Sequence, residues 1–155
     1  MALSFGISFA PNHPRDVGEW CRASEEAGFE RIGMVDSQAI YRELYISCVA
    51  GALATKSIQL GPRVTNALTR HPTVTASALL TLNELTPGRV FAGLGTGDSA
   101  VFNIGLKPVK LATLGEFTAC LRALLRGEST SYQGDRKSTR LNSSHTDISR
   151  MPSSA

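Results

Sequence analysis

Four short apolar runs alternate along the chain with longer segments in which apolar residues recur at helical spacing. The runs begin at Leu3 (LSFGISF), Arg31 (RIGMV), Ser57 (SIQLGPRV) and Arg89 (RVFAGLG). Their starting positions are 28, 26 and 32 residues apart, which is about the length of one strand–helix unit in a parallel sheet. The pattern therefore predicts a strand at each run.

The remaining segments predict four helices. The first has an apolar stripe that ends just before Gly28, a residue suited to the position after a helix. The members of this stripe are Val17, Trp20, Cys21, Ser24 and Ala27. The second helix occupies residues 42–57, where Gly51 weakens the helical propensity slightly, and the third occupies residues 71–88, where Pro72 suits the first turn. The fourth has the clearest stripe: Leu114, Phe117, Leu121, Leu124 and Leu125.

An alternation of strands and helices in this order is typical of an α/β protein with a parallel sheet covered by helices. Two architectures fit: an open doubly wound sheet, and part of an eight-stranded (β/α)8 TIM barrel. A complete barrel takes about 250 residues, so four units ending near Gly134 favour a truncated barrel, its N-terminal half with four βα units. Such a half has unpaired strand edges and an uncovered interior, so we expect it to be unstable or prone to association.

Residues 135–155 differ in character from the rest of the chain. The run DRKSTRLNSSH (Asp135–His145) resembles the translation of a common short-read sequencing adapter, and RMPSSA (Arg150–Ala155) resembles the distal segment of that adapter. The segment has six serines but only one Leu, one Ile and one Met, so we expect no packed element in it. We interpret residues 135–155 as a non-native disordered tail, and residues 1–134 as a partial barrel domain from a longer protein.

Composition excludes several classes of function. Residues 1–134 contain 12 Lys and Arg against 11 Asp and Glu, so their net charge of +1 gives no support to nucleic-acid binding. The N-terminus lacks the pattern of a secretory leader, and no apolar run reaches the roughly 18 residues of a membrane span. Cys21, Cys48 and Cys120 have no metal-site spacing and suit a reducing compartment. We expect a cytoplasmic protein without a metal ion.

In parallel α/β folds the functional residues gather at the carboxyl ends of the strands. The second run leads into Asp36, a carboxylate that could orient a cofactor or take part in proton transfer, although a capping role is the commoner one. The third leads into Thr65 and Asn66, and then into Arg70 and His71. His71 could act as a general acid, or could simply begin the next helix; Arg70 could bind an anion or lie on the surface.

The fourth run leads into the sequence GLGTGDS (Gly93–Ser99). Its alternate glycines would let a flat ring or a phosphate approach the backbone. The segment lacks the dinucleotide-binding fingerprint, because Asp98 and Ala100 stand where a glycine is required, and it has no Walker lysine. The alternative is a tight turn in which Asp98 or Ser99 caps a helix.

These residues also carry a family resemblance. The stretch Val64–Val101 is similar to the N-terminal half of the bacterial luciferase-like monooxygenase superfamily, and most similar to the branch with F420-dependent methylenetetrahydromethanopterin reductases and their FMN-using relatives. The motifs are TRHP (Thr69–Pro72), the TASALLTLNELTPGR helix, GLGTGDSAV, GLKP (Gly105–Pro108), LRALLRGE (Leu121–Glu128) and AGFERIGMVDS (Ala27–Ser37). These motifs are distributed between Ala27 and Glu128.

The resemblance implies a barrel with a flavin or deazaflavin at its C-terminal mouth and redox chemistry by hydride transfer or reaction with O2. Relatives often have a non-prolyl cis peptide in strand three, which would fall around residues 64–66 here, although Ala67 replaces a proline common among them. The residues that would surround the ring are Asp36, Thr65, Asn66, Gly95, Thr96, Gly97 and Asp98, with Asp98 beside the polar edge of the ring.

We therefore predict part of a flavin- or F420-dependent oxidoreductase that acts on a small molecule and forms a homodimer. FMN and F420 are both compatible, as are an alkanal, an alkanesulfonate, a pterin or a sugar phosphate as substrate. Barrels of this type hold the cofactor phosphate in loops after strands seven and eight, so we expect the isolated chain to be inactive and to lose the cofactor. The alternatives are a non-catalytic flavin-binding relative and an open-sheet nucleotide-binding domain.

Overall fold

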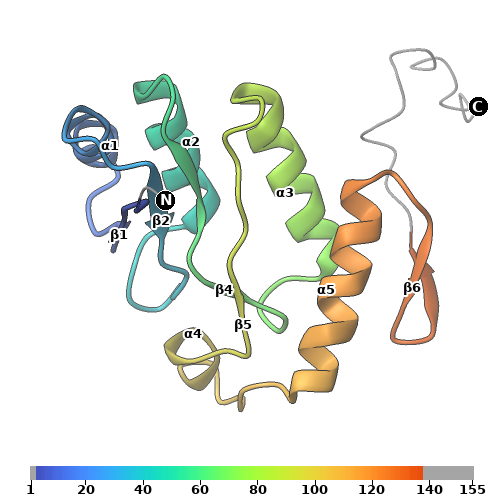
Figure 1. The fold of residues 1–155 in the computed structure, drawn as a ribbon. Helices are drawn as coiled ribbons and strands as arrows, with labels where there is room; N and C mark the ends of the chain where they lie inside the picture. Colours follow the sequence, from blue (N-terminus) through green and yellow to red (C-terminus); the bar gives the residue numbers. More distant parts are fainter. Residues whose placement is uncertain (1–2, 138–155) are drawn as a thin grey trace, which may run out of the picture.

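The computed structural model describes residues 3–137 (Figure 1). The strands are β1 (Gly6–Phe9), β2 (Arg31–Met34), β3 (Gln59–Pro62), β4 (Thr65–Asn66), β5 (Leu94–Gly95), β6 (Thr130–Tyr132) and β7 (Asp135–Lys137). The helices are α1 (Val17–Glu26), α2 (Leu44–Ala54), α3 (Pro72–Leu85), α4 (Ser99–Phe102) and α5 (Leu111–Leu125). None of the helices in this part of the chain is both long and apolar enough to cross a membrane.

The main strands are parallel and lie side by side in the order of the sequence. Strands β1, β2 and β3 form one sheet in which Gly6 pairs with Arg31 and Arg31 pairs with Gln59. Strand β4 pairs with β5, and a parallel bridge from Leu60 to Val90 links the third run to the fourth. This order, in sheets that do not close among the described residues, confirms the predicted truncated barrel.

Two of the four predicted strands are interrupted. The third is divided into β3 and β4 at a non-prolyl cis peptide between Arg63 and Val64, at the start of the expected position. The fourth is reduced to Leu94–Gly95 and the isolated bridge at Val90, because its backbone pairs only intermittently with the strand beside it.

The core lies between the sheet and the helices. Ile32, Met34 and Leu60 point towards the helices and are fully buried against α1 and α2. The residues that alternate with them point to the opposite side of the sheet. Fully burying such a side chain stabilises the fold by about 1.5–3 kcal/mol. Helices α1, α2, α3 and α5 lie next to one another in chain order (Figure 1), and the stripe of α5 packs on α3 in a second cluster that includes Phe117 and Leu121.

Two glycines permit close contacts within this packing. Gly51, which weakens the predicted second helix, faces α1, where an added Cβ would lie 2.7 Å from the sulfur of Cys21. At Gly61 in β3 an added Cβ would lie 1.9 Å from the carbonyl oxygen of Phe91. The approach of the fourth run to β3 therefore requires glycine at position 61.

A terminal hairpin corrects one expectation. Strand β7, residues 135–137, pairs with β6, so the expected absence of a packed element after Gly134 does not hold for those three residues. The missed signal is the turn: Gln133 and Gly134 have φ values of 50° and 82°, as in the two-residue turns that join antiparallel strands. Tyr132 of β6 is buried against Phe117, with ring centroids 6.1 Å apart. Residues 138–155 lie outside the described part.

Glu25 joins the end of α1 to the loop before β3. Its carboxylate accepts hydrogen bonds from the backbone N–H groups of Lys56, Ser57 and Ile58 at 2.6–3.1 Å and from the Ser57 hydroxyl at 2.9 Å. Burial alone would raise the pKa of Glu25, but these bonds favour the ionised form and lower the pKa from 4.5 to about 2. Glu25 therefore stabilises the fold as a carboxylate.

Replacing Glu25 with Gln is expected to flatten the acid dependence of stability. The stabilisation by the carboxylate is fully present above pH 4.5 and is lost as the pH falls towards about 2, because the unfolded chain binds the proton more tightly. Urea unfolding from pH 7 to pH 2.5 should show a lower free energy of unfolding at pH 7 for Glu25→Gln and a smaller loss on acidification. Parallel curves for the two proteins would contradict this role.

Replacing Gly61 with Ala is expected to destabilise the chain by at least about 1–3 kcal/mol, because the methyl group meets fixed backbone. The matched control is Gly115→Ala in α5, where an added Cβ meets nothing within 4 Å and should stabilise the helix by about 0.5–1 kcal/mol. Urea unfolding at neutral pH measures both. Equal effects of the two substitutions would contradict the close approach at Gly61.

Candidate functional site

An open hollow of about 450 Å³ lies at the carboxyl ends of the parallel strands. It contains all seven residues expected to surround a cofactor ring: Asp36, Thr65, Asn66, Gly95, Thr96, Gly97 and Asp98. The remaining lining residues are Val35, Ser37, Tyr41, Arg63, Val64, Ser99 and Ala100. The structure thus brings together residues separated by more than sixty positions in the sequence, and their role in binding stays a prediction.

Asp36 lies at the end of β2 with its side chain only 2% exposed. Its Oδ2 atom accepts hydrogen bonds from Thr65 Oγ1 at 2.6 Å and from Arg70 Nη1 at 2.5 Å. Among the described residues no hydrogen bond reaches Oδ1. The two bonds within the fold therefore use only the Oδ2 atom. A buried carboxylate held in this way is a fixed, charged hydrogen-bond acceptor.

Arg70 is a partner of Asp36 and not a surface arginine. Its Nη2 atom donates to Glu43 Oε1 at 2.8 Å, and its guanidinium lies over the ring of Tyr45, 5.2 Å from the centroid. Burial tends to lower the pKa of Arg70, but the carboxylates of Asp36 and Glu43 raise it above its ordinary value. The guanidinium therefore stays charged and keeps Asp36 in one position.

Thr65 and Asn66 form β4, directly after the cis peptide. Both are buried, and Asn66 Oδ1 accepts hydrogen bonds from the backbone N–H groups of Leu68 and Thr69 at 2.9 Å each. This side-chain turn redirects the chain from β4 towards α3. The cis peptide is present although Ala67 stands where relatives often have proline.

Packing requires glycine at two positions of the glycine-rich segment, in addition to its possible role in binding. An added Cβ at Gly95 would lie 2.9 Å from Val64 Cγ2, and at Gly97, where φ is +109°, it would lie 2.4 Å from Val101 Cγ2. Gly95 therefore lets β5 lie close to the cis-peptide segment, and Gly97 lets α4 fold back close to the end of β5. Asp98 is the N-cap of α4, as the alternative interpretation proposed, but its exposed side chain makes no capping hydrogen bond.

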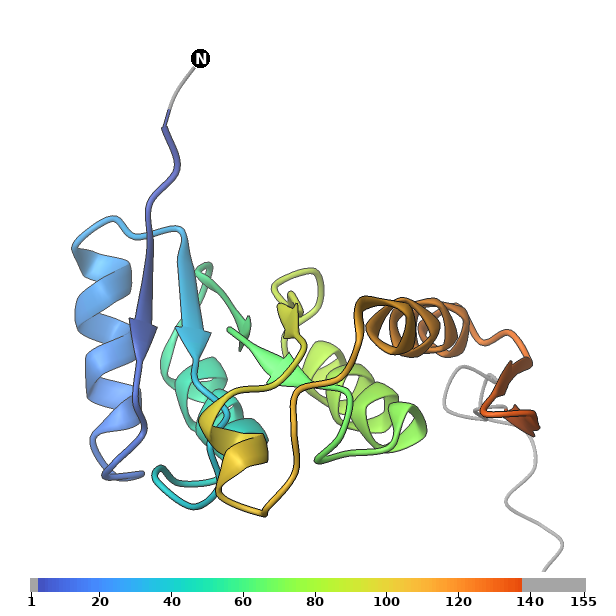
Figure 2. The same ribbon diagram turned by 90° about the horizontal axis from the view of Figure 1, so that it is seen from below.

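The loop after β2 is tied to α4 across the hollow. Ser37 Oγ and Ser99 Oγ are 2.6 Å apart, and Gln38 Nε2 donates to the carbonyl oxygen of Ala100 at 2.8 Å. Figures 1 and 2 show α4 beside this loop. Sequence reasoning marked Ser37 as a strand-end residue and Ser99 as a strand-end or capping residue. It missed Arg63 and Val64 because the cis peptide interrupts a run that predicts an unbroken strand.

His71, the second weak catalytic candidate, does not line the hollow. It is the exposed N-cap of α3, where its Nδ1 accepts from the backbone N–H of Thr73 at 3.2 Å. Its ring packs edge-on against Tyr132 at 5.3 Å. These contacts support the helix-entry interpretation of His71.

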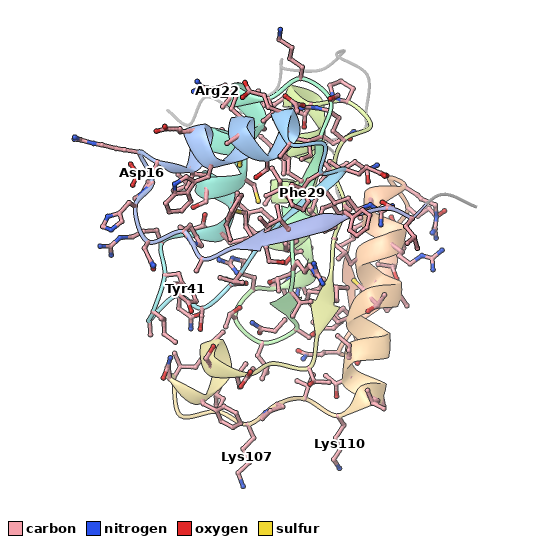
Figure 3. All side chains as sticks on the ribbon, turned by 60° about the vertical axis from the view of Figure 1, so that its left-hand side comes forward. Asp16, Arg22, Phe29, Tyr41, Lys107 and Lys110 are labelled. Atoms are coloured by element: carbon pink, nitrogen blue, oxygen red, sulfur yellow. The ribbon has the colours of Figure 1, made fainter. Side chains whose placement is uncertain are left out.

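Among the described residues, the hollow contains neither a lysine nor a cluster that could bind a metal ion. Lys107 and Lys110 project outward from the segment between α4 and α5 (Figure 3). Within residues 3–137 no group of three or more His, Cys, Asp and Glu side chains could hold a metal ion. The chemistry of the hollow therefore rests on carboxylates, hydroxyls, an amide, the guanidinium of Arg63 and exposed backbone.

Comparison with known proteins assigns the family. Residues 3–154 match the model of the family described as luciferase-like monooxygenase. The 5,10-methylenetetrahydromethanopterin reductase of Methanolobus tindarius is 35% identical over 136 residues, which are 86% of this chain and 41% of the relative.

Solved structures agree with this assignment. The coenzyme F420-dependent tetrahydromethanopterin reductase of Methanopyrus kandleri superposes with a TM-score of 0.73 at 30% identity, over 82% of this chain and 41% of that one. The oxygenating constituent of the 3,6-diketocamphane monooxygenase of Pseudomonas putida, in complex with FMN, shares the fold with a TM-score of 0.72 at 18% identity, over 89% and 44% of the two chains. The chain spans less than half the length of these relatives and belongs to the luciferase-like monooxygenase family.

Proposed function

We propose that this chain forms the ring-facing half of the cofactor site in an F420-dependent oxidoreductase of the luciferase-like family. The observation that carries the proposal is the single hollow that collects Asp36, Thr65, Asn66 and residues 95–98. Relatives that are at least 30% identical include methylenetetrahydromethanopterin reductases and two dehydrogenases that are named as F420-dependent, one for glucose-6-phosphate and one for hydroxymycolic acid. FMN is the alternative cofactor, supported by a structure that shares only the fold.

The residues present fit a flat heterocycle. The backbone of Gly95 and Gly97 offers a surface without side chains, and Val64, 48% exposed, offers an apolar contact at the same hollow. Asp36 and Asp98 provide carboxylates that can accept hydrogen bonds from ring N–H groups. A bound deazaflavin or flavin would supply hydride transfer, while this chain would bind and orient the ring.

A small-molecule substrate would enter from the open side of the hollow. Tyr41, Ser37 and Ser99 border it, and the tie between the two serines fixes that rim. We propose no substrate beyond a small organic molecule. Cys21 and Cys48 are buried and form no disulfide, which supports the proposed cytoplasmic location.

A homodimer is proposed from the outer surface of α2. Exposed or half-buried residues recur there at i, i+3, i+4 and i+7, and all are apolar: Ile46, Val49, Ala50 and Leu53. Helix α2 contains no charged residue. An apolar helix face of this kind is typical of a protein interface.

We expect the isolated chain to bind the ring weakly and to release the intact cofactor. A deazaflavin without its phosphate tail should bind with a Kd on the order of 1 mM, measured by fluorescence titration. Asp98→Asn should weaken this binding roughly tenfold, because a charge-assisted hydrogen bond is lost. Asp16→Asn is the matched control, since Asp16 caps α1 without a side-chain hydrogen bond and lies outside the hollow.

Either of two outcomes would count against this proposal. Equal affinities of Asp98→Asn and Asp16→Asn would remove Asp98 from the site. Tight, stoichiometric retention of F420 or FMN by the purified chain would refute the expected loss of the cofactor.

The dimer is tested separately by Leu53→Lys, which places a charge at the C-terminal end of the apolar face. Sedimentation should show the unmodified chain self-associating and Leu53→Lys largely monomeric, because an unpaired charge is costly in an apolar interface. Arg22→Lys, on the exposed surface of α1, is the control. A Leu53→Lys protein that associates as strongly as the unmodified chain would refute an interface at α2.

A further inference from the structure

Arg63 is the one positively charged residue among the described residues that line the hollow at the carboxyl ends of the strands. It directly follows β3, and Val64 comes next, at the cis peptide. Val64 and residues 95–98 form the side of the hollow that we expect to face the ring, whereas the Arg63 side chain extends towards β1. Arg63 therefore supplies a charge beside the expected ring position.

The neighbouring strands leave a path for the Arg63 side chain. Ser8 of β1 pairs in register with Gly33 of β2. An added Cβ at Gly33 would lie 2.5 Å from Arg63 Cβ and 2.8 Å from Arg63 Cδ, so a larger residue at position 33 would displace the stem. At the far end Arg63 Nη1 donates to Ser8 Oγ at 3.3 Å. These contacts place the guanidinium near the carboxyl ends of β1 and β2.

The carboxylates of the described residues leave the charge of Arg63 unbalanced. Its bond to Ser8 is to a neutral hydroxyl, and none of the ion pairs within residues 3–137 includes Arg63. Asp36 is paired with Arg70, and Asp98 lies at the start of α4. A guanidinium has five N–H donors in a planar fork, so Arg63 has donors left for a ligand in the hollow.

Arg31 lies on the same face of the sheet, the inner face opposite the helices, and shows what distinguishes Arg63. Arg31 Nε donates at 2.9 Å to Oε1 of Gln59, its register partner in β3. Arg31 and Gln59 are the first residues of their strands, and neither lines the hollow at the carboxyl ends. Of the two arginines on this face, only Arg63 adjoins the candidate site.

We propose that Arg63 forms an anion subsite that binds a carboxylate or phosphate group of the substrate. A planar guanidinium can bind two oxygens of such a group through parallel hydrogen bonds. The subsite lies towards β1 and β2, and the ring-facing residues lie at β4 and β5, so a substrate held there would lie beside the ring. This inference rests on the proposed function and narrows its substrate to small organic anions.

The test follows the side-chain Nε–H signal of Arg63 by nuclear magnetic resonance in the presence of a phosphate-free deazaflavin. Acetate, methyl phosphate or neutral methyl acetate is added at constant ionic strength, and the signal is assigned by its loss in Arg63→Gln. The two anions should shift the signal and methyl acetate should not. The larger response distinguishes a carboxylate from a phosphate as the preferred group.

Arg63→Gln should weaken anion binding, followed at the backbone amide of Ser8, by roughly tenfold or more, because charge-assisted hydrogen bonds are lost. Arg63→Lys keeps the charge without the planar fork and should restore part of the binding. Arg31→Gln is the matched control and should leave anion binding unchanged. Both arginines are exposed, so circular dichroism should show that all variants keep their helices.

Two results would overturn the anion subsite. One is an Arg63 signal that responds to neither anion, or responds equally to methyl acetate; the other is equal weakening by Arg63→Gln and Arg31→Gln. The amides of Gly95 and Gly97 report the ring in the same sample. If they respond to the deazaflavin while Arg63 ignores the anions, only the subsite is refuted; if they do not respond, the proposed cofactor site fails.

Discussion

The parallel pairing of neighbouring strands in sequence order is the constraint on which the rest of this structure depends. It separates the two sides of the sheet, so that apolar residues such as Ile32, Met34 and Leu60 meet the helices while Arg31, Gly33 and Gln59 face the other way. It also brings every carboxyl end to one edge, where the polar residues that follow the strands share one hollow.

Within that hollow the Asp36–Arg70 pair connects folding to the proposed function. The buried carboxylate is compatible with the fold because Arg70 and Thr65 bind one of its oxygens, and Arg70 is in turn fixed by Glu43 and the Tyr45 ring. The same bonds hold a charged acceptor in a defined position beside the backbone of the glycine-rich segment. A binding surface of this kind is organised before any ligand arrives.

Much of this arrangement could be predicted from the sequence, because periodicity reports burial and the carboxyl ends of strands are functional in parallel folds. Helices α1, α2, α3 and α5 and all seven expected lining residues follow from those two rules, whereas the short helix α4 was indicated only by the capping alternative for the glycine-rich segment. Contacts between distant residues could not be predicted, since nothing in the local pattern distinguishes Arg70 bound to Asp36 from an arginine in solvent. The division of the third strand was indicated only by family resemblance, and the hairpin turn at Gln133 was missed because glutamine rarely adopts a positive φ.

The most direct test of the account is to locate a bound ring on the chain. Intermolecular nuclear Overhauser effects between a phosphate-free deazaflavin and the protein should involve the methyl groups of Val64 and the amides of residues 95–98. Contacts confined to the inner face near Arg31, or spread over the outer helices, would contradict a cofactor site at the carboxyl ends of the strands.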